Sequence, residues 1–475
     1  MNKSKIALAI MLSGLVSTSV LATNGYFAHG YGAKEKGMAG AGVAKAGNSI
    51  SSANNPALLV DVGDRMDIGF SIFNPVRSVN VSGEPSLPAG FSPVIGGIPS
   101  CSAPGVAPCQ VPFSMNTGTT ESTREWFLVP AFGYSSRIDD TSVWGISVYG
   151  NGGMNSTYKG SDTRIPSARI LDPNTNSIVN SSGIFGAGNT GVDLSQLFIN
   201  TTYAYKASES LDLGVSLILG VQTFEAIGLG PFANISSDPT KLTNNGKDVA
   251  YGLGFKLGGN LDLTETITLG MSYQSEINMT EFKDYAGLFA QGGDFDVPAT
   301  FTVGLAVDIT PTSTFLVDYQ GIYYSDVAAI ANTISPITSG QCFDSLNTFL
   351  FTGAPGNATG PGCLGGSNGA GFGWDDMFVT KVGYEWAVGE DTMRVGYSIT
   401  NQPIPKTEVN FNLLAPGVIE KHFTAGYTMK HGENEWTFFL MYAPEVEVSG
   451  QSAFDPAQTI SFKMHQLEFG VDFQF

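Results

Sequence analysis

The stretch "VAYGLGFKLGGNLDL", residues 249–263, alternates large apolar side chains with small or charged ones. Val249, Tyr251 and Leu253 begin an apolar series with a period of two, which is typical of a β-strand. The intervening series consists of Ala, Gly and an isolated Lys256. In a soluble sandwich the apolar face is also the crowded inner face, whereas here the small residues form the crowded face. The inversion favours a strand whose apolar face meets lipid.

Fourteen segments share this alternation, and their connections alternate between short and long. Short connections include "IDDT" (138–141) and "TET" (264–266). Short turns at one end and long loops at the other are the outer-membrane pattern, so we predict an all-β fold, a 14-stranded antiparallel transmembrane β-barrel. The predicted strands are 65–80, 122–137, 141–154, 194–207, 210–224, 248–263, 265–281, 297–310, 312–325, 376–388, 391–402, 418–430, 434–448 and 463–475.

Composition agrees with a barrel. Charged residues make up 14% of the chain and aromatics 11%, with 59 glycines, whereas a soluble domain carries about 25% charged residues. No stretch beyond the N-terminal region approaches the roughly 18 apolar residues of a transmembrane helix. The net charge of −19 argues against nucleic acid as a partner.

The first 22 residues have the pattern of a secretory signal. Lys3 and Lys5 precede an apolar run, and Val20-Leu21-Ala22 supplies small residues at the cleavage positions. We therefore predict that residues 1–22 are a signal peptide and that the mature chain begins at Thr23. The last segment, "HQLEFGVDFQF" (465–475), ends on an aromatic residue and resembles the signal read by the outer-membrane assembly machinery, a predicted partner.

Four cysteines fall in two local pairs, Cys101 with Cys109 and Cys342 with Cys363. Four cysteines permit three connectivities, and proximity favours the two local bridges in an oxidising compartment. The chain has no C-x2-C spacing and its four histidines are scattered, so we predict neither a metal site nor a cofactor.

Five stretches in register resemble the FadL/TodX family of outer-membrane transporters for hydrophobic compounds. They are "GMAGAGVA…NNPALL" (37–59), "YAGLFAQGGDFDVPAT" (285–300), "VDYQGIYYSDV" (317–327), "GWDDMFVTKVGYEW" (373–386) and "RVGYSITNQPIP…NLLAPGVIEKHFTAGY" (394–427). The resemblance implies an N-terminal hatch, residues 23–64, inside a barrel of residues 65–475. It also implies passive uptake of long-chain fatty acids or aromatic hydrocarbons across the outer membrane of a Gram-negative bacterium. The outer loops would capture the ligand, the hatch would hold it, and a gap at a kink of the third strand would release it sideways.

The third predicted strand has a candidate for that kink. Alternation breaks at Gly150, Asn151, Gly152 and Gly153, and glycine inside a strand marks a bulge, a bend or a close backbone approach. The alternative is that the strand ends here in a turn.

Candidate ligand contacts are the aromatic Tyr26 and Phe27 near the mature N-terminus, together with the outer loops after the first and third strands. The alternative is that these two aromatic residues only pack the hatch and do not contact ligand.

The Gly/Ala-rich hatch has small side chains that allow close approach to the wall. Its Lys34, Glu35, Lys36 and Lys45 are predicted to pair with the acidic lumen. The element Asn54, Asn55, Pro56 and Ala57 resembles the family's Asn-Pro-Ala motif, with Pro56 keeping Asn55 out of a helix. Lys381, Glu385, Arg394, Glu420 and His422 fall on the luminal face, where pairing with one another and with the hatch is expected.

Three other functions remain open at this point. A general porin would leave the N-terminal segment without a purpose. A lipid-modifying enzyme would need a nucleophile beside His422 or His465, but no G-x-S-x-G motif occurs, so we predict that the protein is not an enzyme. An adhesin-type barrel would use the cysteine-containing loops as its working surface. We further predict a monomer with outer-membrane lipid around it.

Overall fold

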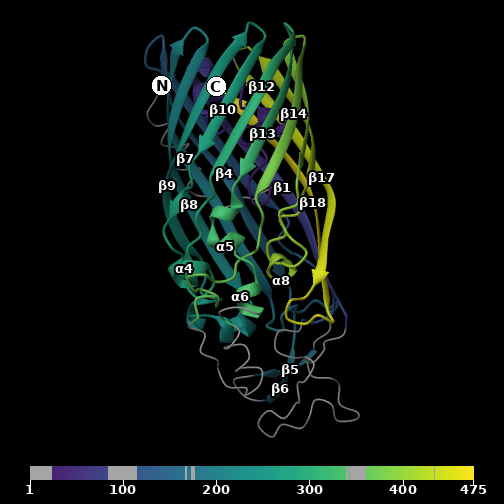
Figure 1. Ribbon diagram of the computed structural model, residues 1–475. Coiled ribbons are helices and arrows are strands. Elements are labelled where there is room, and N and C mark those ends of the chain that lie inside the picture. The colour runs from purple at the N-terminus through teal and green to yellow at the C-terminus, as the bar shows by residue number, and fades with distance from the viewer. Residues whose placement is uncertain are drawn as a thin grey trace.

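The computed structural model describes residues 24–83, 115–165, 168–172, 177–338, 342, 360–432 and 434–475. The predicted signal peptide and the pair Cys101 and Cys109 lie outside these residues. The main sheet has sixteen strands, two of which, β2 (Gly118–Glu121) and β11 (Asn278–Met279), are short additions. The other fourteen form a closed antiparallel ring (Figure 1). A separate hairpin of β5 (Ala168–Asp172) and β6 (Ser177–Ser181) lies at the loop end.

The ring strands follow chain order, each paired with the next, and β18 closes the ring onto β1. Their bounds are β1 Arg65–Ser82, β3 Phe127–Arg137, β4 Ser142–Tyr158, β7 Thr190–Ser208, β8 Leu211–Ile227, β9 Asp248–Thr264, β10 Ile267–Gln274, β12 Thr300–Thr310, β13 Ser313–Ile322, β14 Met377–Val388, β15 Asp391–Thr400, β16 Lys421–His431, β17 Asn434–Gln451 and β18 Thr459–Gln474.

The predicted strands are confirmed in number and order. The largest differences arise where a predicted strand ran into a loop. The predicted strand 122–137 is regular only from Phe127, and 265–281 is interrupted after Gln274 before the short β11. The alternative that the third strand ends in a turn at Gly150 is wrong, because β4 continues to Tyr158.

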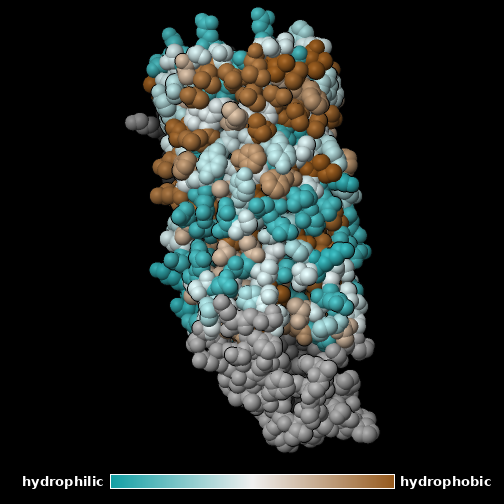
Figure 2. Space-filling view, viewed as in Figure 1, coloured by the Kyte–Doolittle hydropathy of each residue, from teal (hydrophilic) through white to brown (hydrophobic). Residues whose placement is uncertain are grey.

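The alternation predicted from residues 249–263 has the expected orientation. Tyr251 and Leu253 are 55% and 60% exposed on the outer surface, whereas Ala250 and Lys256 on the same strand are buried. Figure 2 shows that apolar side chains gather in a band near the turn end, and polar side chains cover the strands toward the loops. An apolar belt around a closed ring is the surface of a membrane-spanning barrel. Among the described residues, no helix is long and apolar enough to cross a bilayer.

Residues 24–62 lie within the ring and contact strands on several sides of it. They form only short helical turns, because several of their backbone groups bond to the wall: Gly42 N and Val43 N, for example, both donate to Asp318 Oδ2 of β13. Small residues let the N-terminal segment approach the wall closely. A side chain on Gly270 of β10 or Gly396 of β15 would meet the backbone of the N-terminal segment at 2.2 Å. The turns are α2 (Ala33–Lys36), η1 (Ser49–Ala53), η2 (Pro56–Leu58) and α3 (Leu59–Val62).

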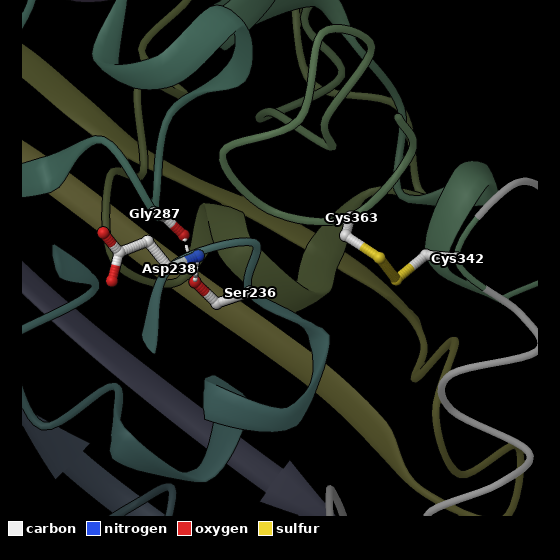
Figure 3. The surroundings of a disulfide bond; sticks show 5 residues. All are labelled: Ser236, Asp238, Gly287, Cys342 and Cys363. Carbon is white, nitrogen blue, oxygen red and sulfur yellow. Dashed lines mark hydrogen bonds between the residues drawn. A yellow bond between two sulfur atoms is a disulfide. The ribbon is translucent and has the colours of Figure 1, made fainter. Parts of the chain in front are cut away.

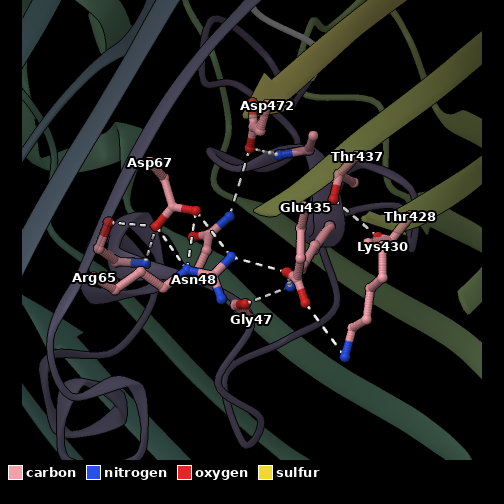
Figure 4. A network of polar contacts seen from close by, with 12 residues as sticks. Gly47, Asn48, Arg65, Asp67, Thr428, Lys430, Glu435, Thr437 and Asp472 are labelled. Carbon is pink, nitrogen blue, oxygen red and sulfur yellow. Dashed lines mark hydrogen bonds and ion pairs between the residues drawn. The ribbon is translucent and has the colours of Figure 1, made fainter. Parts of the chain in front are cut away.

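A polar network, which we call the turn-end latch, ties this N-terminal segment to β1, β17 and β18 (Figure 4). Its members are Lys34, Asn48, Arg65, Asp67, Glu435 and Asp472. Glu435 lies 2.7 Å from Lys34 Nζ and 3.1 Å from Arg65 Nη2. Asp472 accepts a hydrogen bond from Ala33 N at 2.6 Å, and Asp67 accepts one from Ser49 N at 2.8 Å. Because these contacts are directional, they fix where the segment sits.

Two other predicted pairings of the segment with the wall are confirmed: Lys36 pairs with Glu468 at 2.5 Å and Lys45 with Glu385 at 3.0 Å. Glu35, predicted to pair with the lumen, instead accepts a hydrogen bond from Ser51 inside the segment. Asn55 is extended and its side-chain oxygen accepts from Ala57 N at 3.0 Å, so it caps η2. Its amide nitrogen also donates to Val43 O and to Gly259 O of β9, at 2.8 and 3.0 Å.

The long connections carry the remaining described helical turns, which gather at the loop end (Figure 1). They are η3 (Gly230–Ile235), η4 (Pro239–Lys241), η5 (Lys283–Tyr285), α4 (Ala290–Gly293), η6 (Tyr324–Asp326), α5 (Ala328–Ala331), α6 (Ser335–Thr338) and α8 (Val409–Asn412).

Candidate ligand path

An apolar cavity, the outer pocket, lies among the outer loops and has about 490 Å³ of space, partly open to solvent. Strands β7 and β8 and the loops after β8, β10, β13 and β15 supply its walls, and every lining side chain is apolar. The lining residues are Val192, Phe224, Leu229, Phe232, Leu242, Leu288, Phe289, Ala329, Leu364, Ala370, Gly371, Phe372, Phe411 and Leu414. Such walls select ligands by hydrophobicity and shape.

A disulfide fixes one wall of the outer pocket (Figure 3). Cys342 and Cys363 are bonded, as predicted, with their Cα atoms 4.9 Å apart. The next residue, Leu364, donates its backbone N–H to Ile235 O at 2.9 Å and its carbonyl accepts from Ser237 N at 2.8 Å. The bridge closes a loop within the connection after β13, and the two backbone hydrogen bonds of Leu364 hold that connection against the one after β8, where both contribute to the lining.

Five buried aromatic side chains, the aromatic cluster, pack beneath the outer pocket: Tyr26, Phe27, Phe295, Tyr324 and Trp374. The ring centroid of Tyr26 lies 5.3 Å from that of Tyr324 and 6.2 Å from that of Trp374. Two hydrogen bonds fix the chain here, from Tyr26 N to Tyr324 Oη at 3.2 Å and from Tyr324 Oη to Asn24 O at 2.6 Å.

The cluster touches the outer pocket through two of the pocket's own rings. Phe289 lies 4.8 Å from Phe295, and Phe372 lies 6.4 Å from Trp374, between ring centroids. Tyr26 and Phe27 do not themselves line the outer pocket. A ligand descending from the pocket would meet them next, so they occupy the boundary between the outer pocket and the lumen.

Two half-buried carboxylates flank Phe295. Burial, reinforced by repulsion from Asp296, raises the pKa of Asp294 to about 6. Burial likewise raises the pKa of Asp296, whose side chain also accepts a hydrogen bond from Met279 N at 2.6 Å. The turn that presents Phe295 to the cluster therefore carries groups that ionise between mildly acidic and neutral pH.

The barrel wall is incomplete between β3 and β4. The two strands pair only from Arg137–Val143 up to Ala131–Tyr149. Beyond Tyr149 the β3-facing edge of β4 has no strand partner until Thr157, whose carbonyl accepts from Thr123 N at 2.9 Å. We call this interval, residues 150–156 of β4, the wall gap.

A β-bulge causes the separation. β4 pairs with β7 on its other side, but the register shifts between Gly150 and Gly152, so Asn151 is an extra residue. Asn151 is fully buried and bonds inward, donating to Gln196 Oε1 at 2.8 Å and accepting from Tyr31 Oη at 3.0 Å. The predicted kink residues thus form a bulge inside a continuous strand.

The N-terminal segment pairs with the open edge of β4. Ala28 N donates to Asn151 O at 2.7 Å and Gly153 N donates to Tyr26 O at 3.0 Å, which makes Phe27 and Gly152 antiparallel partners. Only glycine fits at position 152, because a side chain there would meet Tyr26 O at 1.7 Å. The structure therefore brings Tyr26 and Phe27 together with Gly150–Gly153, two sets of residues that the sequence analysis singled out separately.

Phe295, Tyr324 and Trp374 are not among the site residues predicted from the sequence. Each of the three lies in a stretch that resembles the FadL/TodX family, but outside the alternating strand residues of that stretch. An aromatic residue at such a loop position was the signal that could have identified them. The loops after β1 and β4, expected to hold ligand, contribute no lining residue to the outer pocket within the described part of the chain.

Comparisons with known proteins agree with this architecture. No protein-family model matches the sequence, and no curated protein matches it. Solved structures do: the toluene transporter TodX of Pseudomonas putida has 14% identity over 94% of this chain and 98% of its own, with a TM-score of 0.61. A FadL homologue of Pseudomonas aeruginosa has 14% identity over 95% and 99%, with a TM-score of 0.59. The chain has the FadL/TodX fold.

The toluene transporter TbuX of Ralstonia pickettii is similar as well, at 15% identity over 93% of this chain and 98% of its own, with a TM-score of 0.51. At these identities the comparisons establish the FadL/TodX fold across nearly the whole chain. A closed antiparallel ring with an apolar belt is the architecture of an outer-membrane β-barrel.

Proposed function

We propose that this protein admits small hydrophobic molecules passively through the outer membrane, with long-chain fatty acids as the favoured ligands. The observation that carries the proposal is the alignment of three features. An apolar outer pocket lies above the aromatic cluster, and the aromatic cluster lies against the wall gap. Together they form an apolar route from the loop end to the side of the barrel.

In this proposal the outer pocket captures ligand and the aromatic cluster holds it above the N-terminal segment. Movement of Asn24–Ala28 away from β4 then opens the wall gap. Trp126, 63% exposed and directly before β3, stands beside the gap on the outer surface. Exposed tryptophan is favoured at the membrane interface, so ligand leaving here would enter lipid. The structural neighbours named as toluene transporters support a small hydrophobic ligand.

A general porin would need an open, water-filled lumen. Residues 24–62 occupy the lumen here and are bonded to the wall by the turn-end latch, which supports a plug. The enzyme alternative has one candidate pair, Ser398 Oγ and His422 Nδ1, 2.8 Å apart. Both residues are 1% exposed or less, and neither lines the outer pocket, so a substrate in that pocket does not reach them.

Whole-cell uptake tests the proposal. A strain lacking its own hydrophobic-compound channels would receive the gene, and uptake of radiolabelled oleate and toluene would be compared with the empty vector. We expect faster uptake of at least one of them, with ionic conductance in planar bilayers far below that of a porin. A steady sugar flux with no gain in hydrophobic uptake would contradict the proposal.

A further inference from the structure

Phe295 joins two parts of the proposed route. Its ring centroid lies 4.8 Å from that of Phe289, which lines the outer pocket, and 6.3 Å from that of Tyr26 in the N-terminal segment. The Phe295 side chain is fully buried, and its backbone carbonyl accepts a hydrogen bond from Gln222 Nε2 at 3.2 Å. A ligand that moves from the outer pocket toward the N-terminal segment therefore meets this ring before it reaches Tyr26.

Two carboxyl groups lie on the other side of the backbone that carries this ring. Asp294 and Asp296 flank Phe295, and Asp294 has extended backbone angles, φ −70° and ψ 130°. Successive side chains of an extended chain point in opposite directions. The ring is accordingly buried, whereas both carboxyl groups are only half-buried and are hydrogen-bonded to each other. Such a bond requires a proton on one of the two carboxyl groups.

A third carboxylate reaches this pair from the opposite side of the loop after β10. Ile277 and Val297 form an antiparallel bridge, with N···O distances of 2.9 and 3.2 Å. The bridge brings Glu276, directly before Ile277, to Asp296, directly before Val297. The charged groups that act on Asp296 are therefore Glu276 and Asp294.

A fourth carboxylate, Glu281, acts on Asp294 from the same side of the loop. Phe282 N donates to Gly293 O at 2.8 Å, and this bond brings the residues on either side of it together. The charged groups that act on Asp294 are Asp296 and Glu281. Within the described part of the chain, no ion pair includes any of the four carboxylates. They therefore share a small volume without a positive charge to offset their repulsion.

Protonation relieves that repulsion. Burial, reinforced by the neighbouring carboxylates, raises the pKa of both Asp294 and Asp296 to about 6. In a loosened loop each carboxyl group would return toward its ordinary pKa of about 3.9. The packed loop therefore binds protons more tightly than the loosened one. It is favoured at low pH and loses that advantage as the pH rises from about 4 through 6.

Resting on the proposed route, we propose that Asp294 and Asp296 form a pH-sensitive gate that moves Phe295. When the two carboxyl groups hold protons, the loop stays packed and the ring blocks the way from the outer pocket to Tyr26. When both are charged, their repulsion loosens the loop and withdraws the ring from the aromatic cluster. Passage of hydrophobic ligand is therefore slow in a mildly acidic medium and faster at neutral pH.

The test uses toluene, which does not ionise, so that pH acts only on the protein. Cells that carry the full-length protein take up radiolabelled toluene at an external pH of 5.5 or 7.5, and the rate of cells with the empty vector is subtracted at each pH. We expect the wild-type rate to be at least about threefold higher at pH 7.5, because both carboxyl groups lose their protons mainly between these two values.

Two variants should fix the gate in opposite states. Asp294→Asn combined with Asp296→Asn keeps the pair neutral, so uptake should stay at the wild-type level of pH 5.5 at both pH values. Phe295→Ala removes the ring and keeps the charges, so uptake at pH 5.5 should rise to the wild-type level of pH 7.5. Asp284→Asn changes an exposed carboxylate of the same loop and is the matched control. It should keep the wild-type dependence on pH.

Equal wild-type rates at the two pH values, or a pH dependence that persists in the double variant, overturn the gate. If the double variant does not assemble, judged by the loss of heat-modifiable migration in electrophoresis, Phe295→Ala decides. A pH dependence that persists without the ring contradicts the proposal. Uptake of neither toluene nor oleate by wild type at either pH would instead count against the proposed function.

Discussion

The two halves of the lumen are closed by different chemistry. At the turn end, the latch joins Lys34, Arg65 and Glu435 through charged, directional contacts (Figure 4). At the loop end, the aromatic cluster holds Tyr26 mainly by ring packing at 5–6 Å, and Tyr324 Oη accepts a hydrogen bond from Tyr26 N and donates one to Asn24 O. Polar networks specify one geometry, whereas apolar packing tolerates rearrangement more readily. Under the proposed function, the turn end is the fixed closure for water and ions, and the loop end is the movable closure for apolar ligand.

Removing the bulge should have the largest effect. Deletion of Asn151 restores one-to-one pairing between β4 and β7, which lets β4 run straight and closes the wall gap. We expect hydrophobic uptake by cells to fall at least about tenfold, a change of about 1.4 kcal/mol or more. Asn151→Ala keeps the bulge and loses only the bonds to Gln196 and Tyr31, so its effect should be smaller. Normal uptake by a folded deletion variant would rule out the wall gap as the exit.

The turn-end latch comes next. Glu435→Gln removes the counter-charge of Lys34 and Arg65, at a cost of about 2–3 kcal/mol, less than for a fully buried pair because Glu435 is 13% exposed. We expect higher ionic conductance in planar bilayers and unchanged hydrophobic uptake. Glu445→Gln, which breaks an exposed pair with Lys463, is the control and should change neither. A loss of uptake without added conductance would show that the two closures are not separate.

Removal of the disulfide should have a moderate effect on the affinity for hydrophobic ligand. Replacing both Cys342 and Cys363 by Ser frees the loop segment that carries Leu364 and Phe372 into the outer pocket. Ordering that loop on binding then costs free energy, so we expect roughly threefold weaker binding of toluene by calorimetry, about 0.7 kcal/mol. Ionic conductance should not change, because the latch lies at the other end. Unchanged affinity would show that the neighbouring loops hold this wall without the bridge.

The smallest effect concerns pH. The folded-state pKa of Asp294, raised to about 6, lies above its unfolded value of about 3.9. The contribution of Asp294 to the free energy of unfolding is therefore most favourable at low pH, where its carboxyl group is protonated in both the folded and the unfolded protein. That contribution is lost as the pH rises from about 4 through 6. Asp294→Asn should raise the melting temperature by a few degrees at pH 8 and leave it unchanged at pH 3.5. Asp139→Asn, where hydrogen bonds from Thr141 lower the pKa, should not stabilise at pH 8. A shift for Asp294→Asn that is equal at both pH values would contradict the burial argument.

The sequence predicted the barrel well because each strand carries its own evidence. Residues 249–263 show which face meets lipid without reference to any other strand. The kink was found for the same reason, since three glycines within four residues interrupt a local pattern. The partners of that kink were not predictable. Phe27 and Gly152 are 125 residues apart, and only the closed ring brings them together.

The candidate site was harder to predict for a related reason. Phe295 comes from the loop after β10, whereas Tyr324 and Trp374 come from the two ends of the long loop after β13. Nothing in the local pattern of either loop shows that its aromatic rings meet Tyr26.

The most direct test asks whether ligand leaves while the N-terminal segment beyond Ala28 stays fixed to the wall. A side chain at Gly383 of β14 would place its Cβ 3.4 Å from Ala41 Cβ, close to the roughly 3.5–4.5 Å spacing of disulfides, but 2.8 Å from Met38 Cβ. In a chain that carries Met38→Gly and whose four native cysteines are Ser, cysteines at 41 and 383 would bind residue 41 to β14 and leave Asn24–Ala28 free to move. The account predicts equal uptake of radiolabelled oleate with this bond oxidised or reduced. Uptake that stops on oxidation and recovers on reduction would show that ligand passes through the lumen, and would contradict the account.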